Sequence, residues 1–163
     1  MSVVENLLVA QHTRVNRSLI AGILNTKAYR QSESDALERA FYWLGVVDLV
    51  DSANRLAGEL SYGQQRRLEI ARAMCTNPEI VCLDEPAAGL NPSETEALTK
   101  MIRVLRDEHN ATVLLIEHDM GMVMDISDRV VVLDYGKKIG DGTPDEVRNN
   151  QDVIDAYLGV AHD

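Results

Sequence analysis

The sequence predicts an α/β protein with a helical first part and a second part built on parallel strands that are flanked by helices. Two short apolar runs, Ile80–Leu83 and Thr112–Ile116, have the length of strands that are buried on both faces. A helical pattern lies between them, and strands that alternate with helices usually pair in parallel. Because the earlier residues show mainly helical patterns, we predict a helical subdomain over 1–76 and a partial α/β core over 77–163.

Helices in the first part are predicted from apolar side chains at helical spacing. The first helix covers residues 3–10, whereas residues 11–31 mix basic and apolar side chains and yield no assignment. An amphipathic helix follows over 32–44, ends at Gly45 and is succeeded by a short helix over 46–51. The apolar stripe of the 32–44 helix consists of Ala36, Leu37, Ala40, Phe41 and Leu44.

The second part begins after Asn77-Pro78, which ends the preceding helix. Between the two apolar strands, a capping box of Ser93 and Glu96 opens a helix that runs to about Glu108. A short helix then leads to Asp128. The remaining predicted elements are a hairpin over 129–139 that turns at Tyr135-Gly136, a short helix that starts at Pro144 and a last helix over 152–158.

Composition limits the classes of function that the chain can have. The chain has 163 residues, enough for one domain with a core, and 45% of them are hydrophobic, as is typical of a globular protein. Its formal net charge is -10, with 26 acidic against 16 basic residues. Because phosphate backbones attract basic surfaces, we expect no nucleic-acid partner. A mononucleotide needs only a local site and stays possible.

The cysteines and the lengths of the apolar runs indicate whether the chain is a soluble, reduced protein or a membrane-spanning one. Cys75 and Cys82 form no metal-ligand pattern, so we expect reduced core cysteines, with a disulfide between them as the weaker alternative. The start of the chain lacks the basic residues of a signal peptide and carries an acid at Glu5. Its apolar runs are shorter than the roughly 20 residues that span a bilayer. The expected protein is soluble, or held at a membrane by a partner.

A polar turn that runs into a helix marks the first candidate site. Ser61-Tyr62-Gly63 precedes a helical pattern rich in Gln and Arg. The free N–H groups and the positive dipole end of a bare helix start can bind an anion. An ordinary helix cap explains the same residues, so the turn alone leaves both interpretations open.

Ionisable residues at two strand ends form the second candidate site. Asp84 and Glu85 follow the first apolar strand, and His118 follows the second. Because ligands of parallel sheets bind beyond the carboxyl ends of the strands, these residues favour a magnesium-nucleotide site. One acid can bind the metal, the next can activate a water and the histidine can contact a phosphate. Taken singly, the acids also fit a solvated loop and the histidine a structural role.

The order of these motifs resembles that of ATP-binding cassette (ABC) ATPases over essentially the whole chain. Residues 60–64 (LSYGQ) are similar to the family's signature motif, and residues 80–86 (IVCLDEP) to its Walker B strand with the catalytic glutamate. Residues 88–92 (AGLNP) match the D-loop, and residues 116–119 (IEHD) match the switch-histidine loop.

The resemblance implies an incomplete P-loop NTPase fold and a role for each candidate residue. ATP and Mg²⁺ are the implied cofactors, and each ATP lies between two cassettes that dimerise head to tail. By resemblance, Asp84 serves Mg²⁺, Glu85 orients the attacking water and His118 senses the terminal phosphate. The residues expected to contact nucleotide across the dimer are Ser61, Gly63, Gln64 and Asn91, the last in a position where many ABC proteins have Asp.

Within this family, the chain resembles the ATP-binding subunits of branched-chain amino-acid importers. The features that point there are Asn91, the AYLG sequence of Ala156–Gly159 and the long segment before Ser32. The implied partners are a second ATPase subunit and membrane permease subunits, for which residues 3–44 are the candidate docking surface. The implied location is cytoplasmic, at the inner face of the cell membrane through the permease.

The sequence contains no G-x-x-x-x-G-K-S/T phosphate loop, on which phosphoryl transfer in this family depends. It also lacks the family's first β-subdomain, so it resembles the C-terminal two-thirds of an ABC ATPase. A truncated gene product, an expressed fragment and a split subunit all remain open. We expect poor nucleotide binding and negligible hydrolysis by the chain alone, and exposed apolar strand edges.

Two other functions remain open at the level of sequence. An ABC protein of DNA repair or translation is disfavoured by the net charge of -10 and by the lack of a basic stripe. A non-catalytic truncated module that acts as an interaction piece would explain the missing phosphate loop. The joint presence of Asp84, Glu85 and His118 speaks against a long-standing loss of catalysis.

Overall fold

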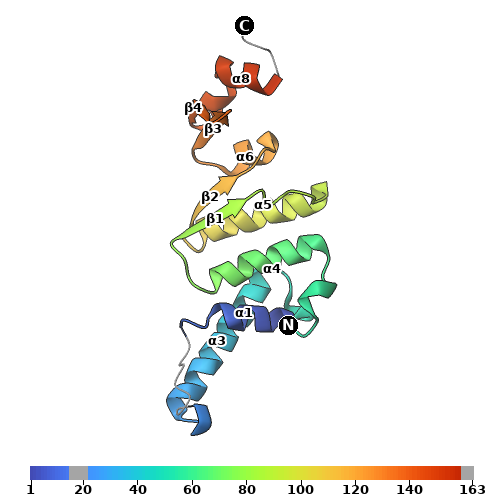
Figure 1. The fold of residues 1–163 in the computed structure, drawn as a ribbon, viewed down its shortest axis with the longest axis vertical. Helices are drawn as coiled ribbons and strands as arrows, with labels where there is room; N and C mark the ends of the chain where they lie inside the picture. Colours follow the sequence, from blue (N-terminus) through green and yellow to red (C-terminus); the bar gives the residue numbers. More distant parts are fainter. Residues whose placement is uncertain (15–21, 159–163) are drawn as a thin grey trace. The chain divides into compact units, whose positions relative to one another are not determined.

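A computed structural model describes residues 1–14 and 22–158 (Figure 1). The chain divides into two compact units. The first unit comprises Met1–Val81 and Ala87–Leu114, and the second comprises Cys82–Pro86 and Leu115–Asp163. The boundary predicted between residues 76 and 77 marks the change from helical to strand patterns in the sequence, whereas the two units are defined by contacts between residues. The predicted division into subdomains stays a prediction.

Helices dominate the first unit. They are α1 (Val3–Ala10), α3 (Lys27–Val46), α4 (Tyr62–Met74) and α5 (Pro92–Asp107), with short 3₁₀ turns at Val50–Ser52 and Ala57–Glu59. Helix α1 packs against both α3 and α4, and α3 also packs against α4. The largest fully buried apolar side chains of this unit are those of Leu7, Leu44, Leu49, Leu98 and Leu105. The helix predicted over residues 3–10 is confirmed.

Helix α3 differs from its prediction in length and in its buried face. It begins earlier because the side chain of Thr26 accepts a hydrogen bond from the N–H of Tyr29 at 3.3 Å, and it continues through Gly45 to Val46. Leu37 and Phe41 are 43% and 40% exposed, whereas Ala36, Ala40, Trp43 and Leu44 are buried. The short helix predicted over 46–51 is wrong, since Asp48 takes a left-handed φ of 55° and a 3₁₀ turn follows.

A buried glutamine joins α1 to α3. The side chain of Gln11 is fully buried and its Nε2 donates to the carbonyl of Ala36 at 2.9 Å. Its Oε1 accepts from Nη1 of Arg39 at 2.7 Å. Because both ends of the amide are paired, this buried polar group is compatible with the core.

Strands β1 (Ile80–Asp84) and β2 (Thr112–Ile116) form a two-stranded sheet. The N–H of Thr112 donates to the carbonyl of Glu79 at 2.9 Å, and the N–H of Glu85 donates to the carbonyl of Ile116 at 2.8 Å. These bonds advance in the same direction along both strands, so the pair is parallel as predicted. The fold is therefore a mixed α/β fold with a partial parallel sheet.

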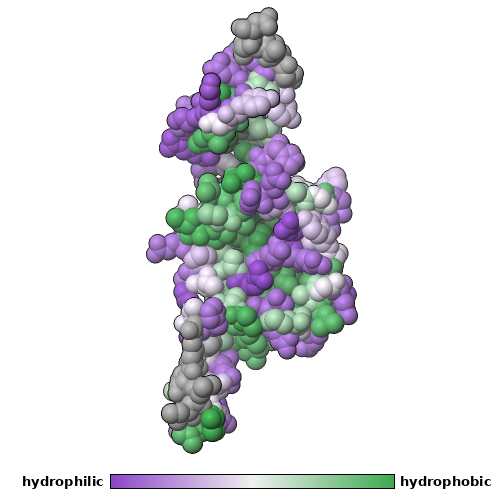
Figure 2. Space-filling view, viewed as in Figure 1, coloured by the Kyte–Doolittle hydropathy of each residue, from purple (hydrophilic) through white to green (hydrophobic). Residues whose placement is uncertain are grey.

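The two strands are not buried on both faces, and that part of the prediction is wrong. Ile80, Leu114 and Ile116 are 61%, 56% and 57% exposed. Figure 2 shows the resulting apolar surface over β1 and β2. Among the described residues the sheet has only these two strands, so their side chains lack the covering layer that a larger sheet would supply. The separate expectation of exposed strand edges concerns unpaired backbone groups and stays a prediction.

The second unit is built around an antiparallel hairpin. Strands β3 (Val130–Asp134) and β4 (Lys137–Gly142) pair from Val130↔Gly142 to Asp134↔Lys137. Tyr135 and Gly136 have φ angles of 44° and 78°, which is the positive-φ pair of a type I′ turn. The predicted hairpin is confirmed. The helices described in this unit are α6 (Met120–Ile126), α7 (Pro144–Arg148) and α8 (Gln151–Leu158).

One side of the hairpin carries the core of the second unit. Val130 of β3 is buried with Val147 of α7 and Val153 of α8, and Val132 and Ile139 pack against them. Gly140 must lack a side chain here, since a Cβ would lie 2.8 Å from Cγ2 of Val153. The Ala156–Gly159 motif ends outside the described residues.

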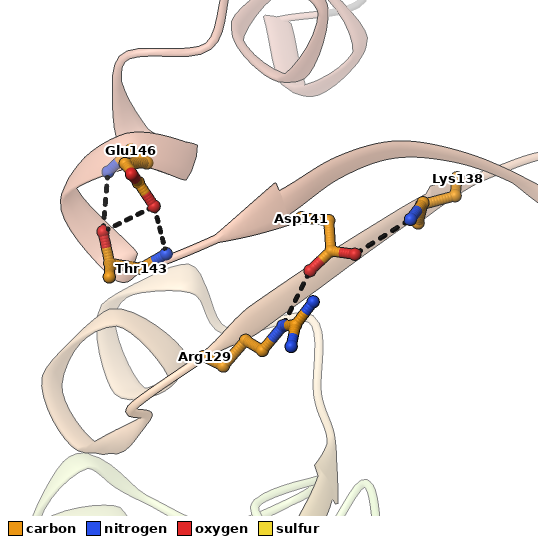
Figure 3. A network of polar contacts seen from close by, with 5 residues as sticks. All are labelled: Arg129, Lys138, Asp141, Thr143 and Glu146. Carbon is orange, nitrogen blue, oxygen red and sulfur yellow. Dashed lines mark hydrogen bonds and ion pairs between the residues drawn. The ribbon is translucent and has the colours of Figure 1, made fainter.

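A charged network ties the ends of the hairpin together (Figure 3). The carboxylate of Asp141 accepts from Nε of Arg129 at 2.9 Å and from Nζ of Lys138 at 2.8 Å. These hydrogen bonds lower the pKa of Asp141 from its usual 3.8 to about 2. Beside it, Thr143 and Glu146 form a reciprocal cap of α7 that lowers the pKa of Glu146 in the same way.

Protonation of Asp141 should weaken this network and make the chain less stable in acid. Because the folded-state pKa lies below the unfolded value, the stabilisation is present above about pH 4 and is lost as the pH falls towards 2. We expect Asp141→Asn to reduce the pH dependence of the unfolding free energy in this window, measured by urea titrations between pH 2 and 5. Asp51→Asn, which changes an exposed acid of the first unit, is the control; an equal effect of both changes would contradict the assignment.

The two cysteines are free, so the disulfide alternative is wrong. Cys75 is buried as expected, and burial raises the pKa of its thiol to about 11. Cys82 lies on the exposed face of β1, so its expected place in the core is wrong. Its burial was inferred from the apolar run, which would be covered only in a larger sheet. In the described part of the chain, no helix has the length and hydropathy required to cross a membrane.

Candidate functional site

The signature turn, Ser61–Gln64, opens helix α4 in the first unit. Ser61 is the N-cap, and its Oγ accepts from the N–H of Gln64 at 3.3 Å. In return, Oε1 of Gln64 accepts from the N–H of Ser61 at 3.0 Å. The prediction of a bare amide end is therefore wrong in part, because a capping box satisfies these donors. The positive end of the helix dipole is still located at this turn.

Gly63 is buried where the starts of α4 and α5 approach each other. A Cβ on Gly63 would lie 2.7 Å from Oε1 of Glu94 and 2.9 Å from its Cδ. No side chain fits there unless Glu94 moves. A side chain at residue 63 would thus displace the Glu94 carboxylate, which is the movable end of that side chain.

Tyr62 is held on the surface beside this contact. Its hydroxyl accepts from Nη2 of Arg66 at 2.6 Å and from Nε at 3.1 Å. The Arg66 guanidinium also lies 5.0 Å from the centre of the Tyr62 ring, within cation–π range. Arg66 in turn pairs with Glu69 at 2.8 Å.

Asn91 of the D-loop is the N-cap of α5. Its Oδ1 accepts from the N–H of Glu94 at 3.0 Å and from the hydroxyl of Ser93 at 2.6 Å. Its own N–H donates to Oε2 of Glu94 at 3.1 Å. The capping box predicted from Ser93 and Glu96 is therefore wrong: Pro92 at the first helical position places the cap at Asn91. Glu96 instead pairs with Lys100 at 2.6 Å.

A cavity of about 120 Å³ lies between the starts of α4 and α5. Gly63 lines it together with the polar residues Ser61, Gln64, Arg66, Ser93 and Glu94. The structure thus brings the predicted residues of the signature turn next to the start of the D-loop helix. The proposed contact of these residues and of Asn91 with nucleotide stays a prediction.

The strand-end residues lie together in the second unit. Asp84 is the exposed last residue of β1, and Glu85 follows it with a left-handed φ of 44°. Such a conformation is strained for a residue with a side chain and is often found at functional sites. Nδ1 of His118 lies 3.7 Å from Oε1 of Glu85. Glu85 and His118 therefore meet at the carboxyl end of the parallel pair, and their catalytic roles stay a prediction.

A second carboxylate stands beside the histidine. The side chain of Glu117 is 1% exposed, and its Oε2 lies 3.8 Å from Nδ1 of His118. The same oxygen accepts from the backbone N–H of His118 at 3.2 Å. His118 itself is open, with 76% of its side chain exposed.

The implied magnesium fits Asp84 only together with a nucleotide. The described residues contain no group of three or more side chains that could hold a metal ion. Mg²⁺ keeps several waters and is usually bound through one or two carboxylates together with substrate phosphates. An exposed carboxylate at the strand end meets this requirement, whereas a metal site without nucleotide does not fit the donors present.

Two residues that the structure places in the site, Glu94 and Glu117, were not predicted as site residues from the sequence. Glu94 could have been found, because it follows Asn91 at the spacing of a capping box with Pro92 between them. Glu117 offered no such signal, since its burial depends on the segments packed around it. Ser61 and Gln64 also have capping-box spacing, and that pattern would have predicted the closed amide end.

The fold and these motifs define an ABC ATPase cassette. Residues 2–88 match the family described as ABC transporter, and residues 137–163 match the family described as Branched-chain amino acid ATP-binding cassette transporter. The chain belongs to the ABC transporter family. Its structure is similar to the ADP conformation of an ATP-binding cassette of an ABC transporter, with a TM-score of 0.77 and 31% identity over 98% of this chain and 63% of that chain.

Relatives that are similar in sequence have more specific descriptions. The chain is 60% identical to the high-affinity branched-chain amino acid transport ATP-binding protein BraF of Pseudomonas aeruginosa, over 99% of this chain and 63% of that protein. It is 56% identical to the protein LivG of Escherichia coli, described in the same words, with the same shares covered. The chain thus spans about 63% of the length of these relatives.

Proposed function

We propose that the chain is part of an ATP-binding and ATP-hydrolysing subunit of an ABC importer for branched-chain amino acids. The observation that supports this most is the pairing of Glu85 and His118, 3.7 Å apart at the end of the parallel strands. The 60% identity to BraF over nearly the whole chain supports the same class and substrate. The whole importer's activity, substrate and partners are inferred from these relatives.

Each candidate residue has a role in this proposal. Bound Mg²⁺ would neutralise the charge that develops on the phosphates, and Asp84 would hold it or one of its waters. Glu85 would orient the attacking water and accept its proton, while His118 would donate a hydrogen bond to the terminal phosphate. Ser61, Gly63, Gln64 and Asn91 would face the nucleotide of a second subunit in a head-to-tail dimer.

The partners follow from the same class. Permease subunits would hold the chain at the inner face of the cell membrane, on the cytoplasmic side. The second candidate function is a non-catalytic interaction module, in which the residues at the strand ends would not act on nucleotide. The two functions differ in whether the site can be completed by a second polypeptide.

Calorimetry with Mg-ATP separates these functions. We expect no measurable binding to the chain alone, because the lysine and backbone amides of a phosphate loop are not in its sequence. We expect binding after addition of a polypeptide that carries the family's phosphate loop. The control is the same pair with Asp84→Ala and Glu85→Ala in this chain. If the two polypeptides associate without binding nucleotide, the proposed ATPase role is wrong and the interaction module is favoured.

A further inference from the structure

The carboxylate of Glu94 lies between two loops that belong to different motifs. Its Oε2 accepts from the N–H of Asn91 at 3.1 Å, at the end of the D-loop. Its Oε1 faces Gly63 in the signature turn, so closely that a Cβ there would lie 2.7 Å away. One side chain therefore contacts both loops, with one oxygen directed to each.

The position of this carboxylate is set by its own helix. The N–H of Glu94 donates to Oδ1 of Asn91 at 3.0 Å, which completes the reciprocal cap of α5. Gly63 lies in the first turn of α4, so the carboxylate stands near the amino ends of two helices. Negative charge at such ends is favourable, because the helix dipoles place partial positive charge there.

Tyr62 of the signature turn also lies near the D-loop. Gly89 has a φ of 77°, and a Cβ on it would lie 3.4 Å from Cε1 of Tyr62. The Tyr62 ring is itself held by Arg66. Tyr62 is thus a neighbour of the D-loop, whereas the contact between the two loops is made by the Glu94 carboxylate.

We propose that Glu94 is a positioning residue that holds the signature turn and the D-loop in one fixed arrangement. The consequence of this inference for nucleotide binding rests on the proposed function. In that function, the residues of the signature turn and of the D-loop that face nucleotide would move together rather than independently. The Glu94 carboxylate, which lies against both loops, would limit the movement of one loop against the other. Preorganised donors avoid the cost of ordering them when the ligand binds.

Glu94→Asp separates this role from the effect of the charge at the start of α5. Aspartate keeps the charge in the first turn of α5, but its side chain is shorter by one methylene and does not reach Gly63. We expect amide exchange at Gln64 and Gln65, whose N–H groups are hydrogen-bonded to Ser61, to become about tenfold faster in the 163-residue chain, followed by NMR. Glu96→Asp, in the same helix and paired with Lys100, is the control and should leave these amides unchanged.

A coupling experiment excludes a merely structural explanation. Ser61→Ala should shift the amide resonances of Gly89–Asn91 when Glu94 is present, and should no longer do so in the Glu94→Asp background. Circular dichroism checks that each variant is folded, and Glu94→Ala, which also removes the contact with Gly63, replaces Glu94→Asp if the latter unfolds. Unchanged exchange at Gln64 and Gln65, or equal shifts in both backgrounds, would overturn the inference.

The expected effect of Glu94 on nucleotide binding is tested by a separate measurement. If the completed assembly binds Mg-ATP, Glu94→Asp should raise the half-saturating ATP concentration about tenfold, and Glu96→Asp should not. Equal affinities would overturn the consequence for nucleotide. The exchange and coupling measurements need no nucleotide, so they test the positioning role of Glu94 even if the proposed function fails.

Discussion

Glu85→Gln is expected to reduce ATP hydrolysis by the completed assembly by roughly 10²- to 10⁴-fold, the usual contribution of a positioned general base. The amide keeps the shape of the side chain but cannot accept the proton of the attacking water. Mg-ATP binding should persist, because the change leaves Asp84 and the phosphate contacts in place. The measurement is single-turnover phosphate release at saturating ATP, with calorimetry of binding alongside.

The control for this prediction is Glu79→Gln, which changes an acid just before β1 and outside the strand-end site. It should leave the rate of phosphate release unchanged. Glutamine has the same side-chain length and branching as glutamate, so the left-handed φ of 44° at residue 85 should cost the same in both, and the comparison should not mix chemistry with relief of backbone strain. Phosphate release that persists in Glu85→Gln would show that another group activates the water.

Leu105→Ala should destabilise the chain by about 2–5 kcal/mol, the range for removing a buried leucine side chain. Leu105 of α5 is 0% exposed, and its side chain is among the largest that are fully buried. Its loss leaves a cavity that close-packed neighbours fill only in part. The free energy of unfolding, measured by urea titration, should fall by this amount.

The matched control is Lys100→Ala in the same helix. The Lys100 side chain is 70% exposed and pairs with Glu96 one turn away, so its loss should change the unfolding free energy by about 0.5 kcal/mol or less. Equal effects of the two changes would mean that α5 is not anchored through Leu105. Since α5 carries Asn91 and Glu94 at its start, this anchor also supports the D-loop.

Helices and strands were predicted best where the signal is local. The helix over 3–10, the hairpin with its Tyr135-Gly136 turn and the parallel pair all follow from spacing, turn residues and apolar runs. The ends of α3 and α5 were misplaced, because Thr26 and Asn91 were overlooked as caps. Both errors concern local chemistry that the sequence does contain.

Burial was predicted less well. The apolar run of β1 led to the expectation of a covered strand, yet Ile80 and Cys82 are exposed. In α3 the buried face lies on Ala36, Ala40, Trp43 and Leu44 rather than on Leu37 and Phe41. A pattern shows that a face is apolar, but the segments that pack against it decide which of its side chains leave the solvent.

The sequence by itself determined the family, the order of the motifs and the residues at the strand ends, because these depend on residue types and short spacings along the chain. Only the tertiary structure decided that His118 lies 3.7 Å from Glu85, that Glu117 is buried and that Glu94 fits against Gly63. In each case the partners come from separate loops or depend on burial by distant segments. Their approach is set by how helices and strands pack, and no local pattern in the sequence records that packing.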